Sequence, residues 1–181
     1  YKVADAVNRK KVGKLLDLGC GPGSYTAAIL KEDKTATATL MDRAAAIKVA
    51  RKLCKTQSVY NRLHFVSGDF FDDELGGGYD TVLMSNIIHI YNATENKNIF
   101  EKINKALKKG GRFVLYDLFL NNSKTGPYDA ALFAITMLLY TKTGKSYAFG
   151  EVESLLRNAG FARIKKTKIG DGSSIVEAIK I

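Results

Sequence analysis

The spacing of apolar and polar residues changes repeatedly along this chain and predicts strands that alternate with helices. Short apolar or β-branched runs are typical of buried strands, and they occupy residues 15–18, 36–41, 62–67, 79–86 and 112–117. Apolar residues three and four positions apart predict helices at residues 2–8, 24–30, 44–55 and 94–108. Thr94 is the expected N-cap of the longest helix, and Gly110-Gly111 are expected to end it.

Two further helices are predicted at residues 130–140 and 150–158. The last strands, at residues 161–168 and 174–181, are separated by Gly170-Asp171-Gly172, which is typical of a hairpin turn. This order predicts an α/β fold, a Rossmann-like, doubly wound and mostly parallel seven-stranded sheet with an antiparallel C-terminal hairpin strand. We expect residues 1–181 to form one domain, because no repeat or low-complexity linker interrupts them.

Composition restricts the class of protein further. The 181 residues are 46% hydrophobic and 25% charged, and no apolar run approaches the roughly 18 residues of a membrane span. The chain starts without an apolar leader, and its two cysteines and two histidines suggest reduced thiols and no metal site. We therefore expect a cytoplasmic protein with no membrane or metal partner.

The net charge of +10 raises the possibility of nucleic-acid binding. The basic residues are spread along the sequence, as in Arg9-Lys10-Lys11, Lys108-Lys109 and Lys165-Lys166, and no aromatic residues interleave with them. We interpret them as a basic but ordinary surface, and nucleic acid is not the expected partner.

A glycine-rich turn follows the first strand, in the run Asp17-Leu18-Gly19-Cys20-Gly21-Pro22-Gly23-Ser24. Glycines let the backbone approach a ligand, and the helix start behind them offers free N–H groups. The spacing is G-x-G-x-G, with Ser24 where dinucleotide sites have a third glycine, and no lysine follows as in a phosphate-binding loop. With Asp17 two places ahead, the turn resembles the first motif of class I S-adenosylmethionine-dependent methyltransferases. A nicotinamide cofactor is the alternative.

Acidic residues at the ends of the next strands support a nucleoside-bearing ligand. Asp42 ends the second strand, where a carboxylate can accept hydrogen bonds from ribose hydroxyls of either cofactor. Asp69 follows the third strand and could accept from an adenine amine while Phe70 packs on the ring. A turn residue and a core residue are the respective alternatives.

Later segments make the resemblance narrower. Ser85-Asn86-Ile87-Ile88-His89 follows the fourth strand, Leu107-Lys108-Lys109-Gly110-Gly111-Arg112 follows the next helix, and Gly144-Lys145-Ser146-Tyr147 precedes Glu151. In this order they resemble the catalytic domain of the O-methyltransferase family of plant phenolic and hydroxyindole enzymes and their prokaryotic relatives. The resemblance implies a small-molecule methyl acceptor and S-adenosyl-L-methionine as cofactor, bound by Asp17, Gly19, Gly21, Gly23, Asp42, Asp69, Phe70 and Ser85.

The resemblance also assigns a catalytic base. In the family a histidine after the fourth strand removes the proton of the acceptor hydroxyl, and His89 matches it position by position. Asp117 matches the acidic residue that steers this histidine, in place of the usual glutamate. Ser146 replaces a second glutamate, and His89-Ile90-Tyr91 lacks the acidic residue that often follows the histidine. These departures leave open that His89 only positions the acceptor.

Family members also carry an N-terminal helical dimerisation domain that closes the acceptor pocket. The resemblance therefore implies a homodimeric full-length protein whose dimerisation domain is absent from this chain. An acceptor pocket is expected along the helix at residues 130–140. There Met137 is a candidate contact, whereas Phe133 is more typical of a core or interface.

Two other functions stay open. A nucleic-acid methyltransferase would suit the charge, but no proline-containing motif follows the fourth strand and Cys54 lies on the wrong helix. A non-catalytic scaffold would suit Ser146, although the complete set of cofactor-site residues weighs against it.

Overall fold

The structure of this chain, a computed structural model, describes residues 2–170 and 172–181. Its strands are β1 (Lys14–Leu18), β2 (Thr37–Asp42), β3 (Leu63–Ser67), β4 (Tyr79–Ser85), β5 (Leu107–Leu120), β6 (Tyr147–Ala148), β7 (Phe161–Lys168) and β8 (Ser173–Lys180). Its helices are α1 (Lys2–Asn8), α2 (Ser24–Glu32), α3 (Ala44–Cys54), α4 (Ala93–Ala106), α5 (Tyr128–Tyr140) and α6 (Phe149–Asn158), with short 3-10 turns η1 (Tyr60–Arg62) and η2 (Ile88–Ile90). Asp171 of the predicted hairpin turn lies outside the described residues.

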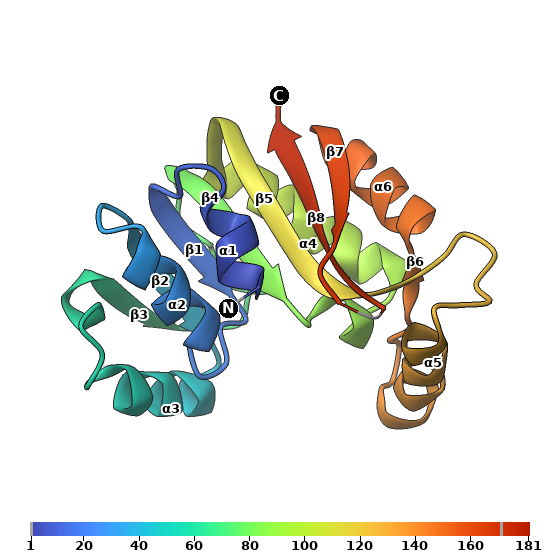
Figure 1. Ribbon diagram of the computed structural model, residues 1–181, viewed down its shortest axis with the longest axis horizontal. Helices are drawn as coiled ribbons and strands as arrows, with labels where there is room; N and C mark the ends of the chain where they lie inside the picture. The colour runs from blue at the N-terminus through green and yellow to red at the C-terminus, as the bar shows by residue number, and fades with distance from the viewer. Residues whose placement is uncertain (1, 171) are drawn as a thin grey trace.

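The strands form one twisted sheet in the order β3-β2-β1-β4-β5-β8-β7 (Figure 1), and the two-residue β6 pairs with the end of β5. From β3 to β5 all neighbours are parallel, whereas β8 is antiparallel to both β5 and β7. The predicted fold class is confirmed. Strand order reverses between β1 and β4, and open α/β sheets bind ligands at the carboxyl ends beside such a reversal.

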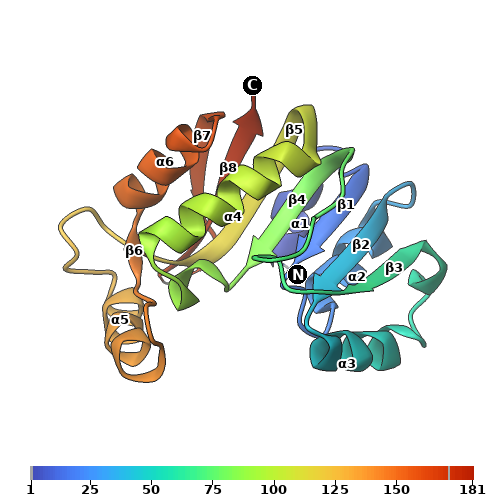
Figure 2. The ribbon, with the colours of Figure 1, turned by 180° about the vertical axis from the view of Figure 1, so that it is seen from behind.

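Helices cover both faces of the sheet. On one face α1, α2 and α3 bury an apolar cluster that includes Leu15, Ile29 and Leu40. On the other face lie α4 and α6, as the view from behind shows (Figure 2), and Phe100 of α4 packs against Phe113 of β5. In these helices the apolar residues recur at the spacing of the buried face, which is why the sequence predicted them.

The start and the end of α4 correct two predictions. Asn92, not Thr94, caps the helix: its side chain accepts from the Glu95 N–H at 2.9 Å, and the Glu95 carboxylate accepts from the Asn92 N–H at 2.8 Å. This reciprocal pair satisfies two helix-start donors at once. The helix ends at Ala106, and β5 begins at Leu107, so Gly110 lies inside an irregular stretch of β5 and does not end the helix.

Helix α5 lies apart from the two layers, beyond the carboxyl end of the sheet (Figure 1). It buries Ala130 and Met137, but it leaves a large apolar surface exposed, made of Leu132, Ile135, Leu138, Leu139 and Tyr140. In the described residues no helix is long and apolar enough to cross a membrane.

Candidate functional site

The glycine turn after β1 forms a tight loop at the reversal point of the sheet. Gly19, Gly21 and Gly23 all have left-handed φ, at 73°, 52° and 78°. A Cβ on Gly23 would lie 2.7 Å from Leu40 Cδ2, so close packing as well as conformation requires glycine there. A Cβ on Gly21 would meet nothing within 4 Å. The backbone of Gly21 therefore faces open space, as a ligand-binding loop requires.

A small cavity of about 150 Å³ opens between this loop and the end of β4, lined by residues 19–22 with Asp17, Ser24, Tyr25, Ser85 and Asn86. The Asp17 carboxyl is buried and accepts a hydrogen bond from the Thr26 hydroxyl at 2.5 Å. Burial, with a smaller contribution from the nearby Asp42 charge, raises the pKa of Asp17 to about 7, against the lowering effect of the Thr26 hydrogen bond. The Ser85 hydroxyl is buried and has no partner among the described residues. A polar, positively charged ligand would satisfy both groups.

Asp42 lies at the end of β2, as predicted, and holds the loop. Its Oδ2 accepts from the Gly21 N–H at 2.8 Å, and its Oδ1 accepts from the Arg43 N–H at 2.7 Å. Each carboxylate oxygen retains acceptor capacity. Asp42 can therefore hold the loop and accept from a ligand, and the ribose contact stays a prediction.

Asp69 and Phe70 lie where the alternative interpretations put them, Asp69 in a turn and Phe70 in the core. The Asp69 side chain accepts from the Phe71 N–H at 3.0 Å, as in a turn, and its Oδ2 lies 3.8 Å from an Arg43 nitrogen. Phe70 is buried in the core and packs edge-on against Tyr91 at 6.0 Å. Its ring also lies 3.9 Å from the position of a Cβ on Gly19. Both residues are thus close to the loop, and their contact with a cofactor stays a prediction.

His89 and Asp117 form a pair at the same edge of the sheet. The His89 Nδ1 lies 2.8 Å and 3.0 Å from the two Asp117 carboxylate oxygens. Asp117 is fully buried in β5, and one of its oxygens also accepts from the Leu118 N–H at 2.8 Å. Because a carboxylate only accepts, Nδ1 carries the proton and Nε2 of the neutral ring is left as a proton acceptor.

A buried network holds the η2 turn that carries His89. The Asn96 side-chain amide, fully buried in α4, donates to the Ile88 carbonyl at 2.8 Å and to the Tyr91 carbonyl at 3.1 Å. The Tyr147 hydroxyl accepts from the same amide at 3.0 Å and donates to the Tyr91 carbonyl at 2.7 Å. Residues on both sides of His89 are therefore fixed to two other elements.

Helix α5 supplies one wall beside His89. The Phe133 ring meets the His89 ring edge to face at 4.8 Å between centroids. Phe133 was expected in a core or interface, but the structure places it half-buried against the candidate base. Gly144, after α5, packs so closely that a Cβ would lie 2.2 Å from the His89 carbonyl oxygen. Met137 is buried.

Sequence reasoning missed Tyr25 and Asn86 in the loop cavity, and Asn96, Tyr147 and Phe133 around His89. Asn86 carried a signal, because asparagine directly after a strand often adopts the left-handed φ that it has here, 56°. The other four reach the site only through tertiary packing. Among the described residues no group of three His, Cys, Asp or Glu side chains could hold a metal ion.

Fold and loop together define a Rossmann-like domain of the kind that binds nucleoside cofactors. A family model described as an O-methyltransferase domain matches residues 1–162. The chain belongs to this O-methyltransferase domain family.

Individual relatives agree with this assignment. The chain is 27% identical, over 99% of its length and 52% of the relative's, to 3-hydroxy-5-methyl-1-naphthoate 3-O-methyltransferase of Streptomyces sahachiroi. A crystal structure of an O-methyltransferase-like protein from Nostoc punctiforme superposes with a TM-score of 0.94 at 30% identity, over 98% of this chain and 54% of that one. PigF, an S-adenosyl-L-methionine-dependent methyl transferase of a Serratia species, was solved with SAH. It superposes with a TM-score of 0.87 at 27% identity, over 98% of this chain and 54% of that one. The chain spans about half the length of these relatives.

Proposed function

We propose that this domain transfers a methyl group from S-adenosyl-L-methionine to a hydroxyl of a small aromatic or polyketide-like molecule, with His89 as general base. The observation that carries the proposal is the His89–Asp117 pair, 2.8 Å apart, at the sheet edge that also holds the glycine loop. Ser85 and Tyr116 are register partners in β4 and β5, so the loop cavity and Asp117 lie on adjoining positions. A cofactor in the loop and an acceptor at His89 would be neighbours.

The residues of the loop fit this cofactor, which supplies an electrophilic methyl group on a positively charged sulfur when bound. Gly21 leaves room for close approach, and the Ser85 hydroxyl is free to bond a polar group. The buried Asp17 carboxyl has no basic partner among the residues that the structure describes, so a ligand ammonium would stabilise its ionised form. Neither lysine nor arginine lines the loop cavity to neutralise the pyrophosphate of a nicotinamide cofactor.

His89 fits the task of activating a hydroxyl acceptor. A phenol has a pKa near 10 and is a weak nucleophile at neutral pH. The Asp117 carboxylate fixes the Nδ1–H tautomer and leaves the Nε2 lone pair for the acceptor proton. A positioned base of this kind contributes roughly 10²–10⁴-fold to the rate.

The first test concerns cofactor binding by this chain. S-adenosylhomocysteine is expected to bind one-to-one in a calorimetric titration, and NADH is not. Asp42→Ala removes the carboxylate that holds Gly21 and should weaken binding about 10-fold to 100-fold, as loss of a charge-assisted hydrogen bond does. Asp72→Ala removes an exposed carboxylate in the turn after β3, and this matched control should bind normally. Binding of NADH instead would overturn the proposal.

The second test concerns the base. In the full-length protein, His89→Ala should lower methyl transfer about 10²–10⁴-fold and leave S-adenosylhomocysteine affinity unchanged. His64→Ala, which changes an exposed histidine in β3, should alter neither. Full turnover in His89→Ala would leave His89 without a role as base. If the full-length protein without substitutions binds the cofactor normally but methylates no acceptor, the result would favour a non-catalytic scaffold.

We also propose that the whole protein is a cytoplasmic homodimer that contains a further helical region beside this domain. The relatives are about twice as long as this chain, and the exposed apolar residues of α5 form a surface of the kind that other protein segments cover. Both cysteines are free thiols, as in proteins of a reducing compartment.

A further inference from the structure

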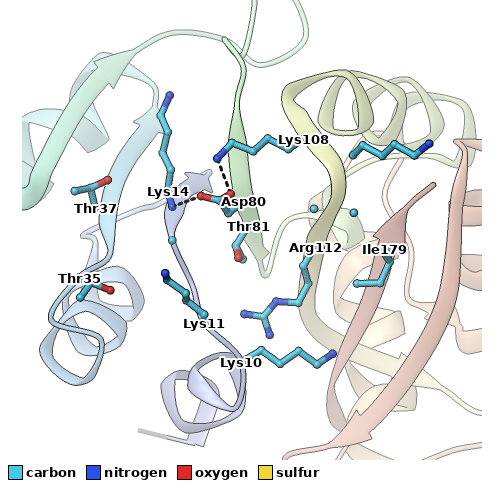
Figure 3. A pocket seen from close by; sticks show the side chains of 14 residues that line it. Lys10, Lys11, Lys14, Thr35, Thr37, Asp80, Thr81, Lys108, Arg112 and Ile179 are labelled. Carbon is cyan, nitrogen blue, oxygen red and sulfur yellow. Dashed lines mark hydrogen bonds and ion pairs between the residues drawn. The ribbon is translucent and has the colours of Figure 1, made fainter.

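A second cavity lies at the edge of the sheet opposite the glycine loop. It has a volume of about 680 Å³ and opens where β1, β4 and β5 begin. Its basic residues are Lys10, Lys11, Lys14, Lys108, Lys109 and Arg112. They come from the loop before β1, from β1 itself and from the first residues of β5. In sequence these lysines are dispersed, but the fold brings them to one concave surface (Figure 3).

The positive charge of this cavity is only partly neutralised. Arg112 is buried and pairs with Glu177 at 2.7 Å, and Lys10 reaches the same carboxylate at 3.4 Å. Lys108 pairs with Asp80 at 2.7 Å. The six basic residues and these two carboxylates leave a net charge of +4 (six minus two).

Two of the lysines take no part in these ion pairs, although the Lys11 charge acts on Asp80 at longer range. Among the described residues, Lys11 and Lys109 make no ion pair within 4 Å and no side-chain hydrogen bond. The Lys14 ammonium donates to the Gly77 carbonyl at 3.1 Å and lies over the face of the Tyr79 ring. Like charges held on a concave surface repel one another, and a bound anion removes that cost.

Asp80 organises the floor of the cavity. Its Oδ2 accepts from the Lys14 N–H at 2.8 Å, and its Oδ1 accepts from the Lys108 ammonium. These hydrogen bonds and the nearby Lys108 and Lys11 charges hold the pKa of Asp80 below its ordinary value, against the opposing effect of partial burial. Gly13 has a φ of 65° and packs against this carboxylate, where a Cβ would lie 2.5 Å from Oδ2. Asp80 is therefore a fixed element of the wall, and its charge is already engaged.

We propose that this cavity binds a compact oligophosphate, meaning two or three linked phosphate groups, either free or as the tail of a nucleotide. Lys11 and Lys109 supply the unpaired ammonium groups, with Lys14 and Lys108 on either side of Asp80. The volume suits a ligand of nucleotide size.

The lining favours phosphate groups over a nucleic-acid strand. Among the described residues that form it there is no aromatic side chain on which a base could stack, and Ile179 is the one large apolar residue. The basic residues lie around a hollow, and the labelled side chains point in different directions instead of forming a stripe that could follow an extended backbone (Figure 3). Because the cavity lies at the opposite strand ends from the glycine loop, the anion bound there is not the methyl acceptor.

The test is a calorimetric titration of this chain with sodium tripolyphosphate at low salt. One-to-one binding is expected, with affinity that falls as salt is raised. The double variant Lys11→Glu/Lys109→Glu breaks no direct ion pair of the described residues and should weaken binding at least about tenfold. Lys52→Glu/Lys165→Glu makes the same change of charge on exposed residues of α3 and β7, and it should weaken binding by less than about twofold.

Titrations with ATP and adenosine show whether the bound phosphates can belong to a nucleotide. ATP should bind as tripolyphosphate does and lose affinity in the same double variant, whereas adenosine should not compete for the cavity. Thermal unfolding of both double variants shows that the fold is intact. Equal losses in the two double variants, or no saturable binding by the parent chain, would overturn the proposal. Binding of a single-stranded oligonucleotide with an affinity that grows with its length, together with no binding of tripolyphosphate, would also overturn the proposal.

Discussion

Asp17 is an ionisable residue that is 2% exposed and receives one side-chain hydrogen bond, from the Thr26 hydroxyl. An unfolded carboxyl titrates near pH 4, whereas burial raises the pKa of Asp17 in the folded chain to about 7. Between these values the folded chain retains a proton that the unfolded chain has released. The contribution of Asp17 to the free energy of unfolding therefore falls as pH rises from about 4 to about 7, and then levels off.

Asp17→Asn retains an oxygen for the Thr26 hydroxyl but cannot ionise. We expect it to raise the free energy of unfolding by an amount that grows between pH 4 and pH 7, on the order of 1–4 kcal/mol at pH 8. Urea denaturation at pH 5 and pH 8 measures the difference, with the exposed Asp72→Asn as control. The variant should also bind S-adenosylhomocysteine more weakly. An equal gain at both pH values would contradict this account of Asp17.

The same residue shows which parts of the site sequence can predict. Asp17, Gly21 and Asp42 were found because a glycine turn between a strand and a helix has few other uses, and strand ends of a parallel sheet meet at one edge. Asn96 and Phe133 carry no such local signal. They reach His89 through the packing of α4 and α5, which depends on the whole fold.

At the scale of elements, the start of α4 shows why helix boundaries are hard to place from sequence. Asn92, Thr94 and Glu95 are all common near helix starts. Only Asn92 stands three residues before Glu95, which allows the reciprocal capping box. The existence of α4 was predicted correctly, because it depends on the spacing of apolar residues, whereas the cap depends on which of several similar residues comes first.

Replacement of the two candidate caps distinguishes them. Asn92→Ala should lower the free energy of unfolding by about 0.5–2 kcal/mol, because the Glu95 N–H loses its acceptor. Thr94→Ala, two residues inside the helix, should change it by less than about 0.5 kcal/mol. Chemical denaturation of the two variants gives the comparison. If Thr94→Ala were the more destabilising, the helix would start where the sequence first suggested.

The η2 turn carries His89, so the packing that holds this turn affects the proposed chemistry. Tyr147→Phe removes the hydroxyl that donates to the Tyr91 carbonyl and accepts from Asn96. We expect the free energy of unfolding to fall by about 1–3 kcal/mol, since buried partners are left unsatisfied. We also expect kcat to fall more than cofactor affinity, because η2 carries His89 and not the glycine loop.

Tyr60→Phe is the matched control for this change, because Tyr60 is half-buried in η1 at the start of β3, and the described structure gives its hydroxyl no hydrogen-bond partner. Unfolding curves and steady-state kinetics of the two variants, in the full-length protein, separate the two effects. A Tyr147→Phe enzyme with normal kcat would show that η2 does not depend on this network for its position.

At the scale of the whole molecule, the sheet has two functional edges in this account. The carboxyl ends of β1, β4 and β5 hold the glycine loop and His89, and their opposite ends gather the lysines around Asp80. The fold class was predictable, because β–α alternation and a terminal hairpin leave few topologies. The convergence of lysines was not, because residues far apart in sequence become neighbours only when parallel strands align their starts.

The exposed side of α5 is the other feature that belongs to the whole molecule. Leu138 and Leu139 are 78% and 72% exposed, on a helix that touches the body of the domain mainly through β5. If this surface lies in the proposed dimer interface, Leu138→Asp/Leu139→Asp should turn a full-length dimer into monomers, because charges buried at an interface without partners are strongly unfavourable. Light scattering after size-exclusion chromatography measures the mass.

Val49→Asp/Leu53→Asp places the same charges on half-exposed residues of α3 and should leave the dimer intact. Dimers that persist in the α5 variant would place the interface elsewhere. Loss of methyl transfer in a variant that stays dimeric would assign α5 to the acceptor pocket alone.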